Sequence, residues 1–290
     1  MGEQGMRNLE RRYRTLLKAL PRWYREDREE EMVGIFLVGR DDDLDLEHGW
    51  PGWGETQAVL GLAVRTHLAA GAGLTGVPAG VMWRGEVVRA LAVIGLLVGV
   101  LYAGASIAGV VLESANPELP ARSAGMVLFD LLPIAAFAAL LAGRRTTAKV
   151  VAFAAAVPAL PVFGPQAGSW LLWQLPSLVA FAALCLGFHR EAPTPPAARL
   201  AWWGGGALVL GVAAWVVPGP FVVAAALVVL RVVAFVRGDF VLGRALSLFA
   251  VLQLAPVVLL AGGVRWWVVL VSAGLLVISA VAPVRKPELA

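Results

Sequence analysis

Residues 87–112 read VVRALAVIGLLVGVLYAGASIAGVVL, and this stretch decides the class of fold. It contains a single charged side chain, Arg89, close to its beginning. A helix needs about 20 apolar residues to cross the hydrocarbon core of a bilayer. Because no water reaches that core, the backbone polar groups must be satisfied within the segment, as a helix does. The stretch therefore predicts a membrane-spanning helix.

Apolar stretches of similar length continue almost to the end of the chain. They account for the 59% hydrophobic composition and the mean hydropathy of +0.76. The alternating pattern of a membrane β-barrel is absent. We therefore expect an all-α integral membrane protein with about eight transmembrane helices and an N-terminal cytosolic helical module. The predicted spans are 87–112, 124–143, 148–165, 169–188, 199–217, 219–236, 243–262 and 265–284.

The loops between these spans predict how the protein is oriented. Each loop assigned to the inner side carries at least two basic residues, whereas the outer loops together carry only Arg122 and Arg265. An excess of Lys and Arg marks cytoplasmic loops. We therefore expect a multi-pass protein of the cytoplasmic membrane with both termini in the cytosol, and the lipid bilayer as its first partner. The inner segments are 143–149, 189–199, 237–244 and 285–290.

Charge and composition exclude several classes of function. Residues 1–86 hold 11 Lys/Arg and 14 Asp/Glu, whereas residues 87–290 hold 13 and 6. The basic excess thus belongs to membrane loops, so no nucleic-acid partner is expected. Cys185 is the single cysteine, and the three histidines lie far apart. No Walker A, nucleophile-elbow, HExxH or dinucleotide motif occurs. We expect no enzyme activity, no cofactor and no metal site.

An acidic segment at residues 41–47 is the nearest approach to a calcium loop. Carboxylates recur at alternate positions, but Leu46 stands where the turn glycine is required and Gly52 where the bidentate glutamate is required. A solvated acidic loop, or a docking surface for a basic partner, is the better interpretation.

The N-terminal module is predicted to cover residues 1–80, and the membrane bundle residues 81–290. Apolar residues at helical spacing predict helices over 8–20, 22–38 and 55–70, with Pro21 opening the second. The glycine-rich segment 71–80 predicts a flexible hinge. We expect the apolar face of the first two helices, within residues 8–38, to bind a protein partner. Its residues are Tyr13, Leu16, Leu17, Trp23, Tyr24 and Met32.

Polar side chains inside the predicted spans are the candidate functional residues. Asp130 and Arg231 are ionisable, and such residues usually face a bundle interior or a water-filled cavity. Their predicted depths allow them to form an ion pair; alternatively, Arg231 extends toward the cytosolic interface and Asp130 makes polar contacts near the outer surface. Gln174 and Gln253 are suited to interhelical hydrogen bonds or to substrate contacts.

Glycine and proline positions add packing predictions. Gly95 and Gly99, followed by Ala103, favour close packing of the first span against a neighbouring helix. Prolines 133, 158, 161, 176 and 256 and the glycine run 204–206 mark predicted kinks or breaks. Residues 132–145 resemble residues 175–190, which fits either a duplicated helical hairpin or chance similarity of Ala/Leu-rich helices.

Residues 11–36, RRYRTLLKALPRWYREDREEEMVGIF, resemble the permease-prefix and HAAS-type helical modules of actinobacterial membrane proteins. Such modules precede multi-pass domains such as ABC-transporter permeases, and some are linked to PadR-type regulators. The resemblance covers under a tenth of the chain, and the spans here follow without a large extracellular domain. The matching residues are Tyr13, Leu16, Leu17, Leu20, Pro21, Tyr24, Arg25, Glu30, Glu31 and Met32.

Two functions follow as expectations. The first is a regulatory or accessory membrane subunit whose N-terminal helices bind a partner. The alternative is a self-contained transporter of a small molecule or ion that uses Asp130 and Arg231. A membrane-embedded enzyme would need clustered His, Asp or Ser at one membrane face, which the sequence does not show.

Overall fold

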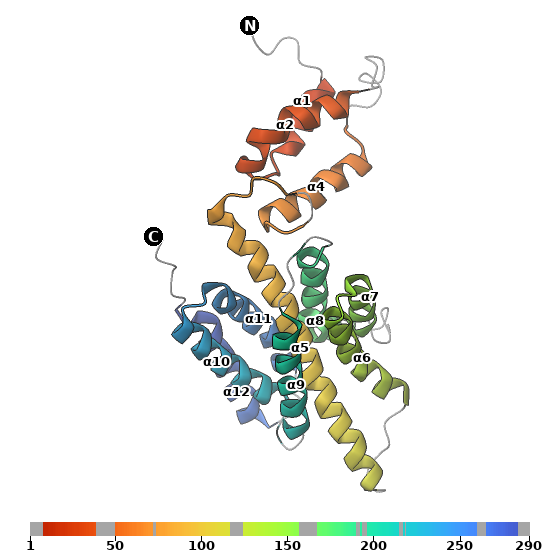
Figure 1. The fold of residues 1–290 in the computed structure, drawn as a ribbon, viewed down its shortest axis with the longest axis vertical. Coiled ribbons are helices and arrows are strands. Elements are labelled where there is room, and N and C mark those ends of the chain that lie inside the picture. Colours follow the sequence, from red (N-terminus) through yellow and green to blue (C-terminus); the bar gives the residue numbers. More distant parts are fainter. Residues whose placement is uncertain are drawn as a thin grey trace. The chain divides into compact units, whose positions relative to one another are not determined.

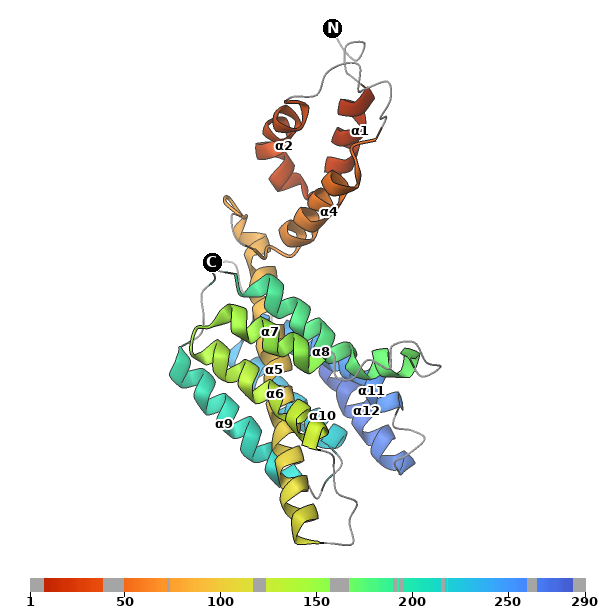
Figure 2. The ribbon, with the colours of Figure 1, turned by 90° about the vertical axis from the view of Figure 1, so that its right-hand side faces the viewer.

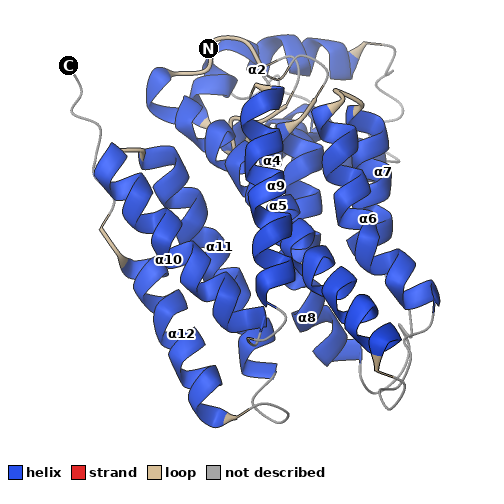
Figure 3. Cartoon of the chain, turned by 60° about the horizontal axis from the view of Figure 1, so that its bottom comes forward, coloured by secondary structure: helices blue, strands red, loops and turns tan. Residues whose placement is uncertain are grey.

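The computed structural model describes residues 8–38, 50–71, 74–116, 124–156, 167–189, 196–214, 219–259 and 265–283, together with Ala192 and Val217. These residues form eleven helices and no strand (Figure 3). The all-α class expected from the sequence is therefore confirmed for the described part of the chain. By internal packing the chain divides into two compact units, Met1–Gly85 and Glu86–Ala290. The sequence placed this boundary five residues earlier.

The first unit packs three helices around one apolar core. They are α1 (Asn8–Leu17), α2 (Arg22–Leu37) and α4 (Trp53–His67) (Figure 1). Apolar side chains recur every three or four residues, which places them on one face of each helix. Pro21 is the N-cap of α2 rather than its first helical residue. The core consists of Leu9, Tyr13, Leu17, Leu20, Val33, Phe36, Val59 and Ala63.

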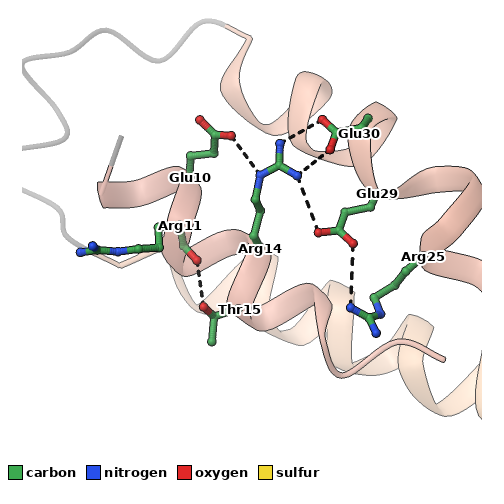
Figure 4. A network of polar contacts seen from close by, with 7 residues as sticks. All are labelled: Glu10, Arg11, Arg14, Thr15, Arg25, Glu29 and Glu30. Carbon is green, nitrogen blue, oxygen red and sulfur yellow. Dashed lines mark hydrogen bonds and ion pairs between the residues drawn. The ribbon is translucent and has the colours of Figure 1, made fainter. Parts of the chain in front are cut away.

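Arg14 joins α1 to α2 through its guanidinium group (Figure 4). Its Nη1 and Nη2 donate to the two carboxylate oxygens of Glu30, at 2.6 and 2.9 Å. Its Nε donates to Glu10 Oε1 at 3.0 Å. The hydrogen bonds to Glu30 raise the pKa of Arg14, and the bonds from Arg14 lower the pKa of Glu30 below its usual 4.5. A forked, bidentate pair of this kind fixes the orientation of both side chains.

Two hydrogen bonds hold the glycine-rich segment predicted as a hinge, one to a residue within it and one between residues on either side of it. Arg28 Nη2 donates to Thr75 Oγ1 at 3.1 Å, which ties this segment to α2. Arg84 Nη1 donates to the carbonyl of His67 at 3.1 Å, which ties the end of α4 to the beginning of the next helix. Gly71 and Gly76 supply the positive φ angles of 125° and 69° that the turns require.

The second unit is organised around α5 (Ala79–Ala115), a helix of 37 residues that begins before the predicted first span and contains all of it. Its small residues allow close neighbours. A β-carbon at Gly95 would overlap Ala180 of α8, and one at Gly99 would lie 2.8 Å from Pro133 Cβ of α6. The predicted packing role of this glycine pair is therefore met within the chain.

Seven further described helices belong to the second unit, and each overlaps one of the remaining predicted spans, but α7 has only 12 residues. Neighbours in sequence pack in pairs, α6 with α7 and α7 with α8 (Figure 2), while α10, α11 and α12 pack on one another and α11 also packs against α8. The helices are α6 (Ala124–Leu141), α7 (Arg145–Ala156), α8 (Ala167–Gly187), α9 (Ala197–Ala213), α10 (Gly219–Arg237), α11 (Phe240–Leu259) and α12 (Trp266–Val281).

Several predicted breaks are absent from the described helices. Pro133, Pro176 and Pro256 lie inside continuous helices, and α9 continues through the glycine run. A helix in such a bundle tolerates these residues because groups from neighbouring helices can satisfy the backbone polar groups that lose their helical partners. Pro158 and Pro161, like the acidic run at 41–47, lie outside the described residues.

The lengths and surfaces of these helices fit a membrane protein. Helices α5, α10 and α11 are long and apolar enough to cross a bilayer, and four shorter apolar helices accompany them. On α10, Val229, Val232 and Val236 are 61%, 57% and 73% exposed, whereas Arg231 on the same helix is 4% exposed. In a membrane, apolar side chains are expected on the outer surface of the bundle and ionisable side chains in its interior, as on α10.

Candidate functional site: a polar cavity among the helices

A cavity of about 810 Å³ opens within the second unit, among α5, α6, α8 and α11. Its size lies in the range of small-molecule sites in proteins, about 300–1,000 Å³. One face of α5 provides a continuous wall, because the lining residues recur every three or four positions. They are Gly95, Gly99, Tyr102, Ser106, Gly109 and Glu113.

Polar side chains reach this cavity from four helices. Asp130 of α6, Gln174 of α8 and Gln253 of α11 all line it, so the fold brings together three of the four polar residues selected from the sequence. Ser106 and Glu113 of α5 join them. Polar groups in a membrane-compatible bundle are costly unless they face one another or water. Their convergence makes this cavity the candidate functional site.

Asp130 is held by a neighbour from another helix. Ser106 Oγ donates a hydrogen bond of 2.6 Å to Asp130 Oδ2. Ser106 is 5% exposed, whereas the Asp130 side chain is exposed and lines the cavity. A bond of this length lies within the ordinary range of O–H···O hydrogen bonds. The contact fixes the carboxylate relative to α5.

Gln253 is the most buried amide of the site. It is 5% exposed and lines the cavity from α11. The amide carries two N–H donors and a carbonyl acceptor. A molecule in the cavity is thus offered both kinds of hydrogen-bonding group. Gln174, which is half-buried on α8, offers the same pair of groups from another side.

The three prolines that lie beyond the first turn of described helices all line the cavity. A proline has no N–H to donate to the carbonyl four residues earlier, so each of Pro133, Pro176 and Pro256 removes one helical hydrogen bond. The helices that surround the cavity therefore carry backbone carbonyls with weakened local pairing. Such carbonyls are tolerated at membrane depth where they border a polar cavity.

Arg231 lies elsewhere and has a structural contact. Its guanidinium Nη2 donates to the carbonyl of Ala282, the C-cap residue of α12. The predicted depths left open an ion pair between Asp130 and Arg231, but the structure does not bring the two side chains together. A cation at a helix C-terminus interacts favourably with the carbonyl ends of the helix. Arg231 Nε is buried and has no hydrogen-bond partner among the described residues.

The residues expected to bind a partner are largely core residues of the first unit. Tyr13 and Leu17 are 4% and 0% exposed, and the Tyr13 ring stacks on Phe36. Three further residues, Leu16, Tyr24 and Met32, pack against the same core. Trp23 is half-buried and meets Tyr24 edge to face. The apolar face recognised in the sequence is thus covered by helices of its own module.

Several lining residues escaped the sequence reasoning, among them Ser106, Tyr102 and Trp173. The signal for Ser106 was present, since it follows Gly95 and Gly99 on one helical face that ends at Glu113. Trp173 and Ser177 lie next to Gln174 and Pro176 but have no intramembrane charge to distinguish them.

Among the described residues no group of three or more His, Cys, Asp or Glu is placed to hold a metal ion. Comparison of the chain with known protein families, with curated proteins and with solved structures found no match.

Proposed function

We propose that the protein is an integral membrane protein that binds a small molecule in the cavity and carries it across the bilayer. The observation that supports this most is the convergence of Asp130, Gln174 and Gln253 on a cavity of about 810 Å³. The outer surfaces of the same bundle are apolar. Binding sites of membrane transporters combine polar groups with interrupted helical hydrogen bonding in the middle of such a bundle.

The proposal includes eight spans with both termini in the cytosol. If consecutive spans run in opposite directions, most of the cavity residues fall in the halves assigned to the outer side, within 95–113 on α5, 129–133 on α6, 173–177 on α8 and 249–256 on α11. The inner ends carry basic residues such as Arg145 and Arg237. This segregation of charge agrees with the positive-inside rule.

Cysteine labelling in intact cells tests the orientation. In a Cys185→Ser background, Ser114→Cys should react with a membrane-impermeant maleimide from outside, because residue 114 lies at the outer end of α5. Arg144→Cys, between α6 and α7, should react only after the cells are permeabilised. The reverse pattern would invert the orientation.

Ligand binding is tested by a stability screen of the purified full-length chain in detergent. Amines, carboxylates, amino acids and sugars are compared for their effect on the unfolding temperature, since a ligand that binds the folded state stabilises it. The same screen uses Ser177→Trp, which places a large ring in the cavity lining, and Ser114→Trp, which adds the ring to an exposed helix end. A true cavity ligand stabilises wild type and Ser114→Trp but not Ser177→Trp. A compound that passes is then followed into proteoliposomes.

An accessory role for the first unit is the second proposal, and α4 supports it. Trp53, Leu60 and Val64 are 76%, 48% and 50% exposed, and their spacing places them along one side of that helix. An exposed apolar stripe beside a complete core is the kind of surface that a protein partner covers. A partner that co-purifies in mild detergent with wild type, but not with Trp53→Ala/Leu60→Ala, would support it. Equal recovery with both chains would refute this surface.

A further inference from the structure

The charge of the cavity lining indicates what kind of molecule it binds; this step rests on the proposed binding function. Among the described residues that line the cavity, the charged side chains are Asp130 and Glu113, both carboxylates. Lys and Arg are absent from that described lining. Charges that are partly shielded from bulk water interact more strongly than charges in bulk solvent, so two carboxylates favour a cation and oppose an anion.

Aromatic rings supply the second selective feature. Tyr102, Phe129, Trp173 and Phe249 line the same cavity, each from a different helix. The face of an aromatic ring attracts a cation, and the attraction is larger where both are desolvated. Carboxylates with aromatic walls therefore favour a cation that also has an apolar body.

The size of the cavity separates this ligand from a simple metal ion. About 810 Å³ is far larger than a coordinated ion requires, and no cluster of metal-ligating side chains occurs among the described residues. The amides of Gln174 and Gln253 add neutral hydrogen-bonding groups rather than the several carboxylates or carbonyls of a hard-cation site.

We propose that the cavity binds a monovalent organic cation, an ammonium group on an apolar body, with Asp130 as the principal charge partner. Ser106 positions that carboxylate through its 2.6 Å hydrogen bond. Glu113, near the end of α5, adds long-range attraction at the cavity rim.

Two ions of the same shape and opposite charge provide the direct test. Binding of tetraphenylphosphonium and of tetraphenylborate to the purified full-length chain is measured by equilibrium dialysis in a non-ionic detergent. The cation should bind at least about tenfold more tightly than the anion, a difference of about 1.4 kcal/mol. Equal binding of both ions, or binding of neither, would overturn the inference.

Variants locate the charge that is responsible. Asp130→Asn should weaken binding of tetraphenylphosphonium by about tenfold or more, and Glu113→Gln by less. Gln174→Glu adds a carboxylate to the lining and should strengthen binding of tetraphenylphosphonium. The test therefore includes an expected gain of affinity as well as expected losses. Glu55→Gln, in the first unit, is the control and should leave binding unchanged. Each variant is first checked for a single peak in size-exclusion chromatography. Unchanged binding in Asp130→Asn with unchanged binding in Gln174→Glu would refute the role of charge.

The ammonium group can come from a soluble amine or from a phospholipid headgroup. Displacement of tetraphenylphosphonium by tetraethylammonium in lipid-free detergent would identify a soluble cation as the ligand. Displacement only by added phosphatidylcholine would assign the site to a headgroup. Both results support recognition of an organic ammonium group.

The failure of this inference is distinguishable from failure of the proposed function. A neutral or anionic compound that stabilises wild type but not Ser177→Trp would keep the binding function and refute the cation class. Conversely, tight and charge-selective cation binding without uptake into proteoliposomes would keep the class and refute transport.

Discussion

Ser106 Oγ of α5 lies 2.6 Å from Asp130 Oδ2 of α6 and donates a hydrogen bond to it. The bond joins two helices at the wall of the cavity, with the donor 5% exposed and the acceptor exposed at the cavity. It links the packing of α5 against α6 to the carboxylate that α6 contributes to the cavity.

Ser106→Ala should loosen this link. The Asp130 carboxylate loses one donor, and hydrogen bonds to charged groups contribute about 1.5–3 kcal/mol. Because Asp130 is exposed, we expect the lower part of that range as a loss of stability, together with weaker cation binding. The measurements are thermal unfolding and tetraphenylphosphonium binding in detergent. Ser114→Ala is the control, since that exposed hydroxyl bonds only within its own helix, to the Val111 carbonyl. Equal values for both variants would contradict the positioning role.

Arg231→Met should affect the end of α12 and leave the cavity unchanged. Arg231 donates to the Ala282 carbonyl and does not line the cavity. Without the cation, the last turn of α12 opens more easily, whereas removal of a buried charge offsets the loss of overall stability. Hydrogen exchange of peptides that cover residues 276–282 should become about tenfold faster.

The matched control for Arg231→Met is Arg237→Met, because Arg237 is an exposed arginine on α10, the helix that also carries Arg231. It should alter neither the exchange at α12 nor the affinity for a cavity ligand. A loss of ligand binding in Arg231→Met, with Arg237→Met unaffected, would return Arg231 to the functional role considered from the sequence.

The sequence located the polar residues of the site better than their partners. Asp130, Gln174 and Gln253 stand out because polar side chains are rare in apolar helices. The spacing along one helix, however, does not determine which helices become neighbours. The contact of Asp130 with Ser106, and of Arg231 with Ala282, depends on the packing of α5 with α6 and of α10 with α12.

The first unit shows that a sequence pattern can identify a buried face without identifying what covers it. The spacing of Tyr13 and Leu17 correctly indicates a face that is covered, and both residues are buried. An amphipathic pattern carries no information about what covers the face. In this chain the cover is α2 and α4 of the same unit, through Phe36, Val59 and Ala63. Intramolecular contacts therefore use the surface that the sequence alone assigned to a partner.

Gly211→Ala should destabilise the bundle. A β-carbon at Gly211 of α9 would overlap the backbone carbonyl of Leu101 on α5, and a backbone cannot move aside as a side chain does. Overpacking of this kind costs about 1–3 kcal/mol. Gly206→Ala on the same helix is the control, because nothing lies within 4 Å of the added carbon. Alanine there should be neutral or stabilising by up to about 1 kcal/mol, since it is a better helix former.

Thermal unfolding of the two glycine variants in the same detergent decides this prediction. A lower midpoint for Gly211→Ala alone is expected. If the two variants unfold at the same temperature, α5 and α9 do not approach each other as closely as the structure shows.

Glu30→Gln should weaken the contact of α1 with α2 only where Glu30 is ionised. The bond from Arg14 lowers the pKa of Glu30 in the folded state, so its stabilisation is present above the unfolded value of 4.5 and is lost as pH falls through the lower folded value. Arg14 stays charged throughout, because its pKa is raised. Since the Glu30 side chain is 80% exposed, salt should screen the effect.

Hydrogen exchange of α1 and α2 in the full-length chain measures this difference. At neutral pH the variant should exchange faster than wild type, and the ratio should approach one below the folded pKa of Glu30 or at high salt. Glu26→Gln is the control, because Glu26 pairs with Arg22 within α2 and does not join two helices. A ratio that does not change with pH would mean that the carboxylate charge is not what matters.

Tyr13→Ala should destabilise the first unit, whereas Trp53→Ala should leave its stability nearly unchanged. Tyr13 is 4% exposed, and its ring lies 3.9 Å from that of Phe36, centroid to centroid. Removing a buried aromatic ring leaves a cavity and costs about 3–5 kcal/mol, a large part of the stability of a small module. Trp53 is 76% exposed, so its removal should cost little. Trypsin digestion of the full-length chain should therefore cleave α1 and α2 much faster in Tyr13→Ala than in wild type, and at the wild-type rate in Trp53→Ala. Should Tyr13→Ala resist trypsin yet lose a bound partner, Tyr13 would be part of a binding surface after all.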